Sequence, residues 1–353
     1  MQKQLLLGVE AIAQGAIDGG ISGVFAYPGT PSTEITEYIQ ESKQAIARNV
    51  HRMWSANEKT AMETALGMSY AGKRALVCMK HVGMNVAADC FMNAAITGAN
   101  GGMVVIAADD PSMHSSQNEQ DSRVYGKFAL IPIMEPSNQQ EAYDMTRYAF
   151  DLSEQMGTPV LLRITTRLAH SRSGVEPREA KAENEMRLPE DKRQFVLLPA
   201  IAKKRYKLLL EKQTAFEEAS DNSSFNQYID GADKSMGIVA CGIGYNYLME
   251  VFGGNCPYPV VKVSQYPLPR KMITKLAEST EKLLVLEEGY PVIEEALKGY
   301  LEKECVLGRL DGTLPRDGEL NPDHVAKAFG LPSIEGSPVP EIVAPRPPAL
   351  CVG

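Results

Sequence analysis

The feature that most constrains the fold is a repeated alternation of short apolar runs and helical patterns over residues 1–170. The segment "QLLLGVEAIAQGAIDGG" (4–20) is typical of a helix that ends in glycines. Apolar runs with polar flanks predict buried strands at "GVFAYP" (23–28), "RALVCMK" (74–80), "GMVVIAAD" (102–109) and "PVLLRIT" (159–165). Strands that alternate with helices form βαβ units, which build mostly parallel sheets. We therefore expect an α/β fold.

A second unit follows a polar, poorly periodic stretch at residues 171–235. This stretch is interpreted as a connecting segment around one helix, at 201–219. A new α/β pattern occupies residues 236–340, with strands expected in 236–251, 259–264 and 282–289 and helices at 271–280 and 291–301. The tail, residues 341–353, is rich in proline, which predicts an extended linker.

The charge balance and the cysteine spacing exclude several kinds of function. The chain has 36 Lys and Arg residues against 44 Asp and Glu, a net charge of −8. It therefore lacks the basic field that nucleic acid or an anionic membrane would need. No apolar run approaches the roughly 18 residues of a membrane span, and the N-terminus does not resemble a signal peptide. The six cysteines are scattered without a C-x-x-C pair, so no local metal site is expected, and a reducing cytoplasm is favoured.

A carboxylate on a helix of small residues is the first candidate for chemistry. The segment "WSANEKTAMETALGMSYAGK" (54–73) predicts this helix, with Glu58 near its start on a face with small apolar side chains. Glu63 can pair with Lys59, whereas Glu58 has no basic residue at i+3 or i+4. Two interpretations remain open from these residues alone. Glu58 either closes a capping box with Ser55 or has a functional partner outside the helix.

Polar loops after the predicted strands are the second candidate, because parallel sheets bind ligands beyond the carboxyl ends of their strands. In "YPGTPSTEI" (27–35), Thr30 suits a helix N-cap, and Gly29 would let the backbone approach an anionic group there. A plain cap is the alternative. The segment 79–90 is expected to hold four polar or small residues in one loop, Lys80, His81, Gly83 and Asn85. A histidine in such a loop is more often structural than catalytic.

Two further segments give weaker indications. The loop 109–123 is dense in hydrogen-bonding groups, which is typical of a substrate loop or of an ordinary surface loop. Arg123 is its best candidate for holding a carboxylate. Gly242 and Gly244 match the start of a dinucleotide-binding pattern, but Tyr247 occupies the place of the third glycine, so the match is weak.

Taken together, these segments resemble the α subunits of indolepyruvate ferredoxin oxidoreductases, which are thiamine diphosphate enzymes of the 2-oxoacid:ferredoxin oxidoreductase family. The resemblance runs almost end to end and is carried by "YPGTPSTEI", "NEKTAMETALGMSYAGKRALVCMKHVGMNVAAD", "IAADDPSMHSSQNEQDSR" and "RPPALC". Within these, "KHVGMNVAAD" and "HSSQNEQDSR" are similar to the indolepyruvate branch in particular.

The resemblance implies a role for each region. Residues 1–170 would be a Pyr-type domain that binds the cofactor's aminopyrimidine ring, and residues 236–340 would resemble the transketolase C-terminal domain. Glu58 would hydrogen-bond the pyrimidine ring and so activate the cofactor. The residues implied in cofactor binding are Gly29, Thr30, Gly83 and Asn85. Those implied in substrate binding are Thr30, Lys80, His81 and Arg123.

The activity implied is oxidative decarboxylation of arylpyruvates such as indolepyruvate to acyl-CoA. Coenzyme A would be a cosubstrate, and electrons would pass to ferredoxin in an oligomer with a β subunit. Alternatives are a ferredoxin oxidoreductase for branched-chain 2-oxoacids or 2-oxoglutarate, or a non-catalytic assembly module.

One departure from the family pattern concerns the other half of the cofactor site. The family binds the diphosphate and Mg²⁺ in a second domain with a G-D-G motif. The segment "RLDGTLPRDGELN" (309–321) contains Asp-Gly twice but no G-D-G, and "PRPPALCVG" (345–353) is similar only to the opening of that domain. Mg²⁺ and iron–sulfur clusters are therefore expected on a missing part of the subunit, and this chain alone is expected to be inactive.

Overall fold

The computed structural model describes residues 3–298 and residue 327. Its largest element is a seven-stranded sheet in the order β12-β6-β7-β5-β4-β2-β3. Every neighbouring pair is parallel except β12 with β6. The predicted α/β class with a mostly parallel sheet is confirmed. The strands are β2 (Gly23–Ala26), β3 (His51–Trp54), β4 (Ala75–Lys80), β5 (Met103–Asp109), β6 (Ile133–Met134), β7 (Val160–Thr165) and β12 (Gln265–Tyr266).

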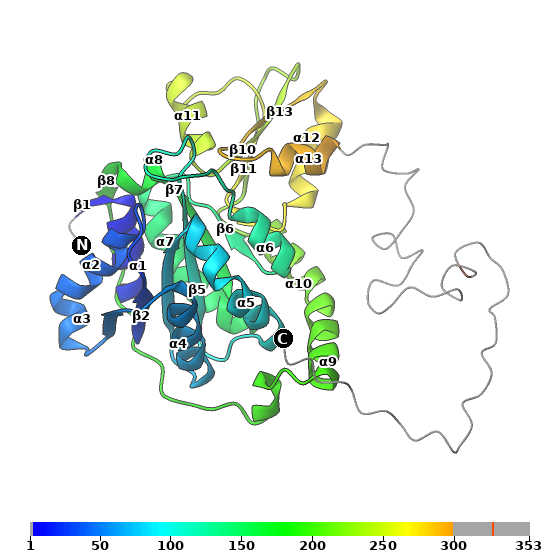
Figure 1. The fold of residues 1–353 in the computed structure, drawn as a ribbon. Coiled ribbons are helices and arrows are strands. Elements are labelled where there is room, and N and C mark those ends of the chain that lie inside the picture. Colours follow the sequence, from blue (N-terminus) through cyan, green and yellow to red (C-terminus); the bar gives the residue numbers. More distant parts are fainter. Residues whose placement is uncertain (1–2, 299–326, 328–353) are drawn as a thin grey trace.

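Helices cover both faces of this sheet (Figure 1). The central strands β4, β5 and β7 are buried on both faces, so alternate side chains enter two different cores, whereas the edge strand β3 is largely exposed. Leu76 and Cys78 of β4 pack into the core with α1 and α7, whereas Val77 and Met79 pack into the core with α4 and α5. The helices of this unit are α1 (Gly8–Asp18), α2 (Thr33–Glu41), α3 (Lys43–Ala47), α4 (Glu58–Tyr70), α5 (His81–Thr97), α6 (Arg123–Ala129), α7 (Gln139–Met156) and α8 (Thr166–His170).

A four-stranded sheet in the order β13-β10-β11-β9 forms the second unit, which lies above the first in the view of Figure 1. β10 is parallel to β11 and β13, while β9 is antiparallel to β11. The second unit also supplies β12 to the edge of the first sheet. Its elements are β9 (Gln227–Ile229), β10 (Gly237–Cys241), α11 (Ile243–Val251), β11 (Val260–Val263), α12 (Arg270–Ser279), β13 (Leu283–Leu286) and α13 (Val292–Lys298).

The segment between the units contains more structure than the sequence predicts. The expected single helix at 201–219 is two helices, α9 (Pro199–Glu211) and α10 (Gln213–Asp221), after a short 3₁₀ helix at Lys192–Phe195. Near the N-terminus the expected helix at 4–20 is also wrong in its first turn. Its first residues form β1 (Gln4–Leu7), which pairs with β8 (Arg172–Val175). Tertiary pairing overrides local helical preference there.

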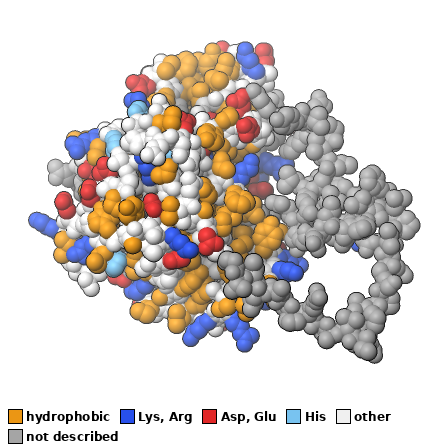
Figure 2. Space-filling model, in the orientation of Figure 1, with side chains coloured by type: hydrophobic (Ala, Val, Ile, Leu, Met, Phe, Trp, Pro, Cys, Tyr) orange, Lys and Arg blue, Asp and Glu red, His pale blue; other side chains and the backbone are white. Residues whose placement is uncertain are grey.

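Several expectations lie outside the described residues. These are the end of the predicted helix at 291–301, the Asp-Gly segment at 309–321, the limit of the second unit at residue 340 and the tail at 341–353. On the face of the described residues shown in Figure 2, basic and acidic side chains are interspersed. Within the described part of the chain, every helix is too short or too polar to cross a bilayer.

The contact between α1 and α7 generates a stability prediction. A Cβ atom on Gly15 of α1 would lie 2.5 Å from the Tyr143 carbonyl oxygen of α7, which is backbone and cannot move aside. Gly67 of α4 has no atom within 4 Å of the equivalent position. We expect Gly15→Ala to lower the free energy of unfolding by about 1–3 kcal/mol through overpacking. The matched variant Gly67→Ala should raise it by roughly 0.5–1 kcal/mol. Denaturant unfolding measures both, and equal shifts would contradict this packing.

Candidate functional site

The candidate residues gather at the carboxyl edge of the seven-stranded sheet. Parallel strands end at one edge, so the segments after β2, β3, β4 and β5 meet there although they are far apart in the sequence. Gly29 and Thr30 follow β2, Glu58 follows β3 and His81 follows β4. The fold therefore brings most of the sequence-predicted residues to one region.

Glu58 is the first residue of α4 and is half-buried. The alternative in which Glu58 closes a capping box with Ser55 is wrong, because Asn57 caps α4. The Asn57 side chain accepts a hydrogen bond of 2.9 Å from the Thr60 amide, and the Thr60 hydroxyl accepts one from the Asn57 amide. Lys59 pairs with Glu63 at 3.9 Å, as expected. Among the described residues, the Glu58 carboxylate has no hydrogen-bond or ion-pair partner, so it is available to a group outside this set.

Gly83 provides the surface against which Glu58 lies. A Cβ atom on Gly83 would stand 2.7 Å from both Cγ and Oε1 of Glu58, so any side chain there would displace the carboxylate. The absence of a side chain lets the carboxylate approach the first turn of α5. Gly83 is one of the residues implied in cofactor binding, and the group that lies against it in this structure is Glu58.

The turn after β2 differs from the prediction. Thr30 is not the N-cap of α2, which begins at Thr33 with Ser32 in the N-cap position. The residues after Thr30 close the turn instead. The Thr33 hydroxyl accepts a 2.8 Å bond from the Gly29 amide, and the Ser32 hydroxyl donates to the Gly29 carbonyl at 2.7 Å. Thr30 is left exposed, and a Cβ atom on Gly29 would lie 3.2 Å from Cβ of Lys80.

Lys80 and His81 do not lie in a loop as predicted. Lys80 ends β4, and α5 begins directly at His81. The buried Lys80 ammonium donates to Ser115, at 3.0 Å to its carbonyl and 3.1 Å to its hydroxyl. The fully buried His81 ring bonds the Asn118 carbonyl through Nε2 at 3.1 Å. A carbonyl can only accept, so Nε2 carries a proton, while the buried Nδ1 has no hydrogen-bond partner among the described residues.

Asn85 lies on the exposed side of α5, one turn beyond His81. Its side-chain oxygen accepts a 2.5 Å hydrogen bond from the hydroxyl of Tyr125 on α6. Sequence reasoning missed Tyr125, because only the tertiary fold brings α6 next to α5. The contact fixes the orientation of Asn85 at the rim of the region that holds Glu58 and Gly83.

Asp110 organises the polar loop after β5, and sequence reasoning missed this role. It accepts hydrogen bonds from the Ser115 amide at 2.8 Å, the Ser116 hydroxyl at 2.5 Å and the Thr166 hydroxyl at 2.8 Å. Burial acts to raise the pKa of Asp110, but these hydrogen bonds outweigh it and hold the pKa below its usual range. The spacing Asp110 to Ser115 and Ser116, directly after a strand, was the available indication of a side-chain-closed turn.

Arg123 occupies a different environment from the one predicted for a substrate clamp. It is 1% exposed and pairs with Asp121 through Nε at 2.9 Å and Nη2 at 2.5 Å. Its Nη1 donates to Glu287 at 2.9 Å, and Nη2 also donates to the Tyr290 carbonyl at 2.9 Å. Because these contacts occupy the guanidinium, the geometry argues against the prediction that Arg123 holds a substrate carboxylate. Its observed contacts join the first unit to the second.

The Gly242 and Gly244 pair is explained by packing. A Cβ atom on Gly242, which has a φ of 48°, would lie 2.6 Å from the Glu135 side chain. A Cβ atom on Gly244 would lie 2.8 Å from the Leu286 carbonyl oxygen. Both glycines therefore allow close approach between elements, and neither requires a nucleotide.

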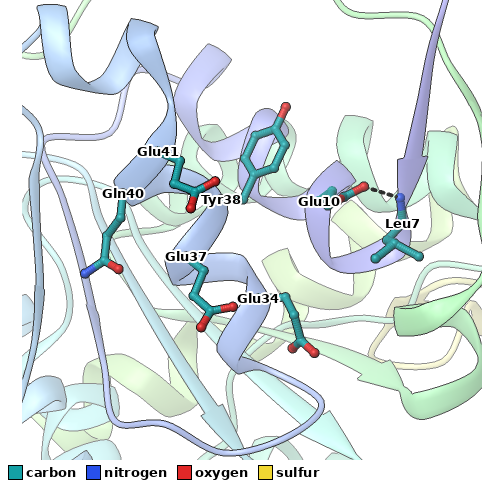
Figure 3. Close-up of a pocket in the computed structure, with 7 residues that line it drawn as sticks. All are labelled: Leu7, Glu10, Glu34, Glu37, Tyr38, Gln40 and Glu41. Atoms are coloured by element: carbon teal, nitrogen blue, oxygen red, sulfur yellow. Dashed lines mark hydrogen bonds between the residues drawn. The ribbon is translucent and has the colours of Figure 1, made fainter.

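A cavity of about 470 Å³ lies between α1 and α2, away from these residues (Figure 3). Its acidic side chains have local roles or face solvent. Glu10 accepts a 2.7 Å bond from the Leu7 amide at the start of α1, and Glu34 lies 3.4 Å from His170. The lining residues are Leu7, Glu10, Glu34, Glu37, Tyr38, Gln40 and Glu41. None of the sequence-predicted site residues is among them.

A comparison with protein families identifies the class to which this α/β chain belongs. The family model described as "Pyruvate flavodoxin/ferredoxin oxidoreductase, thiamine diP-bdg" matches residues 14–227. The chain therefore belongs to this thiamine diphosphate-binding family.

Individual curated relatives give a more specific similarity than the family model does. The indolepyruvate oxidoreductase subunit IorA of Archaeoglobus fulgidus is 43% identical over the whole chain, and that of Pyrococcus abyssi is 41% identical over 99% of it. The chain spans only 59% and 57% of these two relatives. Among solved structures, the 2-oxoglutarate:ferredoxin oxidoreductase from Magnetococcus marinus is similar in fold, with a TM-score of 0.68 at 15% sequence identity. The match covers 84% of this chain and 60% of the chain in that structure.

The contacts of Arg123 generate the second prediction. Arg123→Ala should lower the free energy of unfolding by about 3–5 kcal/mol, because it leaves buried carboxylates without their partner. Arg172→Ala, at an exposed position of β8, is the control and should change stability by less than about 0.5 kcal/mol. Chemical denaturation of the purified chain measures both values. A neutral Arg123→Ala variant, together with a raised KM in the complete enzyme, would instead restore its predicted role as a substrate clamp.

Proposed function

We propose that this chain supplies the aminopyrimidine side of a thiamine diphosphate site, with Glu58 as the activating carboxylate. The observation that carries the proposal is the Glu58 carboxylate itself. It lies against Gly83 at the carboxyl edge of the parallel sheet and has no partner among the described residues. A carboxylate that only caps its own helix would be engaged in the cap, but Asn57 already does this.

The residues present fit such a cofactor. A ring nitrogen of the aminopyrimidine can share one proton with a carboxylate, and Glu58 provides oxygen atoms that are free to take part in such a bond. Gly83 leaves the backbone of α5 open beside that carboxylate, and Gly29 keeps the neighbouring turn close to Lys80. Thr30 is exposed beside this turn, and Asn85 is held in place by Tyr125. In this proposal Gly29, Thr30, Gly83 and Asn85 contact the cofactor.

The role of the protein in the mechanism follows from these positions. When bound, thiamine diphosphate supplies a carbon nucleophile and an electron sink for decarboxylation of a 2-oxoacid. Glu58 would hold a proton at the pyrimidine nitrogen and so favour the acid–base state of the ring that activates the cofactor. Gly83 would set the position of that carboxylate. Lys80 and His81 would act by holding the loop after β5 over the site, through Ser115 and Asn118.

For the complete enzyme we propose oxidative decarboxylation of arylpyruvates such as indolepyruvate to acyl-CoA, with electrons passed to ferredoxin and with a β subunit as partner. The support is the identity of 40–43% to relatives named indolepyruvate oxidoreductase subunit IorA. A second candidate substrate is 2-oxoglutarate, because the structural neighbour is a 2-oxoglutarate:ferredoxin oxidoreductase. We also propose residues 1–170 as the Pyr-type domain and residues 236–340 as the transketolase C-terminal-like domain.

The role of Glu58 can be tested in the complete enzyme. Glu58→Gln should preserve the fold and slow exchange of the C2 proton of bound thiamine diphosphate on the order of 10²–10⁴-fold, the range for a positioned proton-transfer group. Glu63→Gln is the matched control. It lies five residues along the same helix, and its surface pair with Lys59 is worth about 0–1 kcal/mol. NMR exchange measurements follow the C2 proton. If both variants exchange at the wild-type rate, Glu58 has no part in activation.

A further inference from the structure

A second cavity lies at the same carboxyl edge, beyond β7. It has a volume of about 290 Å³ and is lined by His114, Thr166, Arg167, His170 and Ser171. His114 comes from the loop after β5, and the next three residues form most of α8, which follows β7 directly. The cavity therefore stands beside the loop that Lys80 and His81 hold. Unlike the cavity between α1 and α2, it is lined by basic side chains and contains no carboxylate.

The lining side chains differ in whether they already form hydrogen bonds with other residues. The Thr166 hydroxyl donates to Asp110 at 2.8 Å, and the Ser171 hydroxyl accepts from Gln139 at 2.8 Å. In contrast, the side chains of Arg167 and His114 have no hydrogen-bond or ion-pair partner within the residues that the structure describes. Two nitrogen-based donor groups, one from helix α8 and one from the loop after β5, are therefore available at one small cavity.

His170 is the third nitrogen-containing side chain at the cavity, and its contact with Glu34 limits the positive charge there. Its Nε2 lies 3.4 Å from Glu34 Oε1, so one carboxylate already faces one of the two imidazole rings. Arg167 remains the one permanent positive charge among the lining residues. A planar guanidinium binds carboxylate and phosphate oxygens in bidentate fashion. The free donors thus suit a single oxyanion group.

Asp110 connects this cavity to the candidate cofactor site. It accepts the Thr166 hydroxyl bond from one side and lies 3.9 Å from the Lys80 ammonium on the other. The Lys80 backbone in turn adjoins Gly29. A group bound at Arg167 would therefore lie beside the loop that contacts Lys80, the neighbour of Gly29, and His81 at the start of α5. This position suits the anionic end of a substrate.

We infer that the cavity at Arg167, His114 and His170 is an oxyanion-binding site for a small-molecule ligand of this protein. The shared chemistry is a carboxylate or phosphate group held by the Arg167 guanidinium, with His114 as a second donor. The 2-oxoacid carboxylate is one source of this group, and this assignment of source rests on the proposed function. A phosphate group of a cosubstrate is the other source.

Calorimetric titration of the 353-residue chain tests the inference. The probes are indolepyruvate and, separately, inorganic phosphate, in the absence of thiamine diphosphate. Arg167→Gln should weaken binding of the preferred probe by about tenfold or more, because it removes the charge but keeps a polar side chain of similar reach. Arg172→Gln is the matched control. It removes an exposed arginine five residues along the chain that does not line the cavity, and it should weaken binding by less than about twofold.

Each outcome has a defined meaning. Loss of indolepyruvate binding in Arg167→Gln identifies the substrate carboxylate as the source, and loss of phosphate binding identifies a phosphorylated ligand. The inference is overturned if neither probe binds at millimolar concentration, or if Arg167→Gln and Arg172→Gln weaken binding equally. Because these titrations involve no cofactor, their failure is distinct from a failure of Glu58 in the proton-exchange experiment. Arg167 is exposed, so the variant should fold, and thermal melting checks this.

Discussion

Two buried arginines link the seven-stranded sheet to the segment after β13 of the four-stranded sheet, through Glu287 and the Glu288 carbonyl. Arg163 of β7 is fully buried and binds Asp109 at 2.6 Å and Glu135 at 2.5 Å. Arg123, the first residue of α6, binds Asp121 and reaches Glu287 directly after β13. Burial alone would lower the pKa of Arg123, but the surrounding carboxylates raise it above its usual value, so the charge is retained. A charge buried at this depth is tolerated only where partners surround it, which makes the relative position of the two units specific.

The same network fixes the loop over the candidate site. Asp109 stands just before this loop and Asp121 just after its main part, and Arg163 lies 2.6 Å from the first and 3.5 Å from the second. Both ends are thus attached to one guanidinium, while Asp110 and the α5 residues hold the middle. A loop with this many fixed points can present side chains such as His114 in a defined place, as ligand binding requires.

Two glycines determine how closely the remaining candidate residues approach one another. Gly83 permits the Glu58 carboxylate to lie against α5, and Gly29 permits the turn after β2 to lie against Lys80. These contacts do not stabilise the folded state by burying large apolar surfaces. Their effect is geometric, because they let the segments that follow three neighbouring strands approach one another at the edge of the sheet.

The sequence by itself determined the α/β class, most strand positions to within a few residues, and Glu58, Gly83 and Gly29 as candidates. These features depend on local periodicity and on residue size, which neighbouring residues reveal. Only the tertiary structure decided that Tyr125 contacts Asn85 and that Arg123 is buried. Its partner Glu287 is 164 residues away, and nothing near Arg123 in the sequence indicates that contact. The difference is physical, because hydrophobic patterns repeat along the chain, whereas the pairing of a buried charge is settled only when distant segments meet.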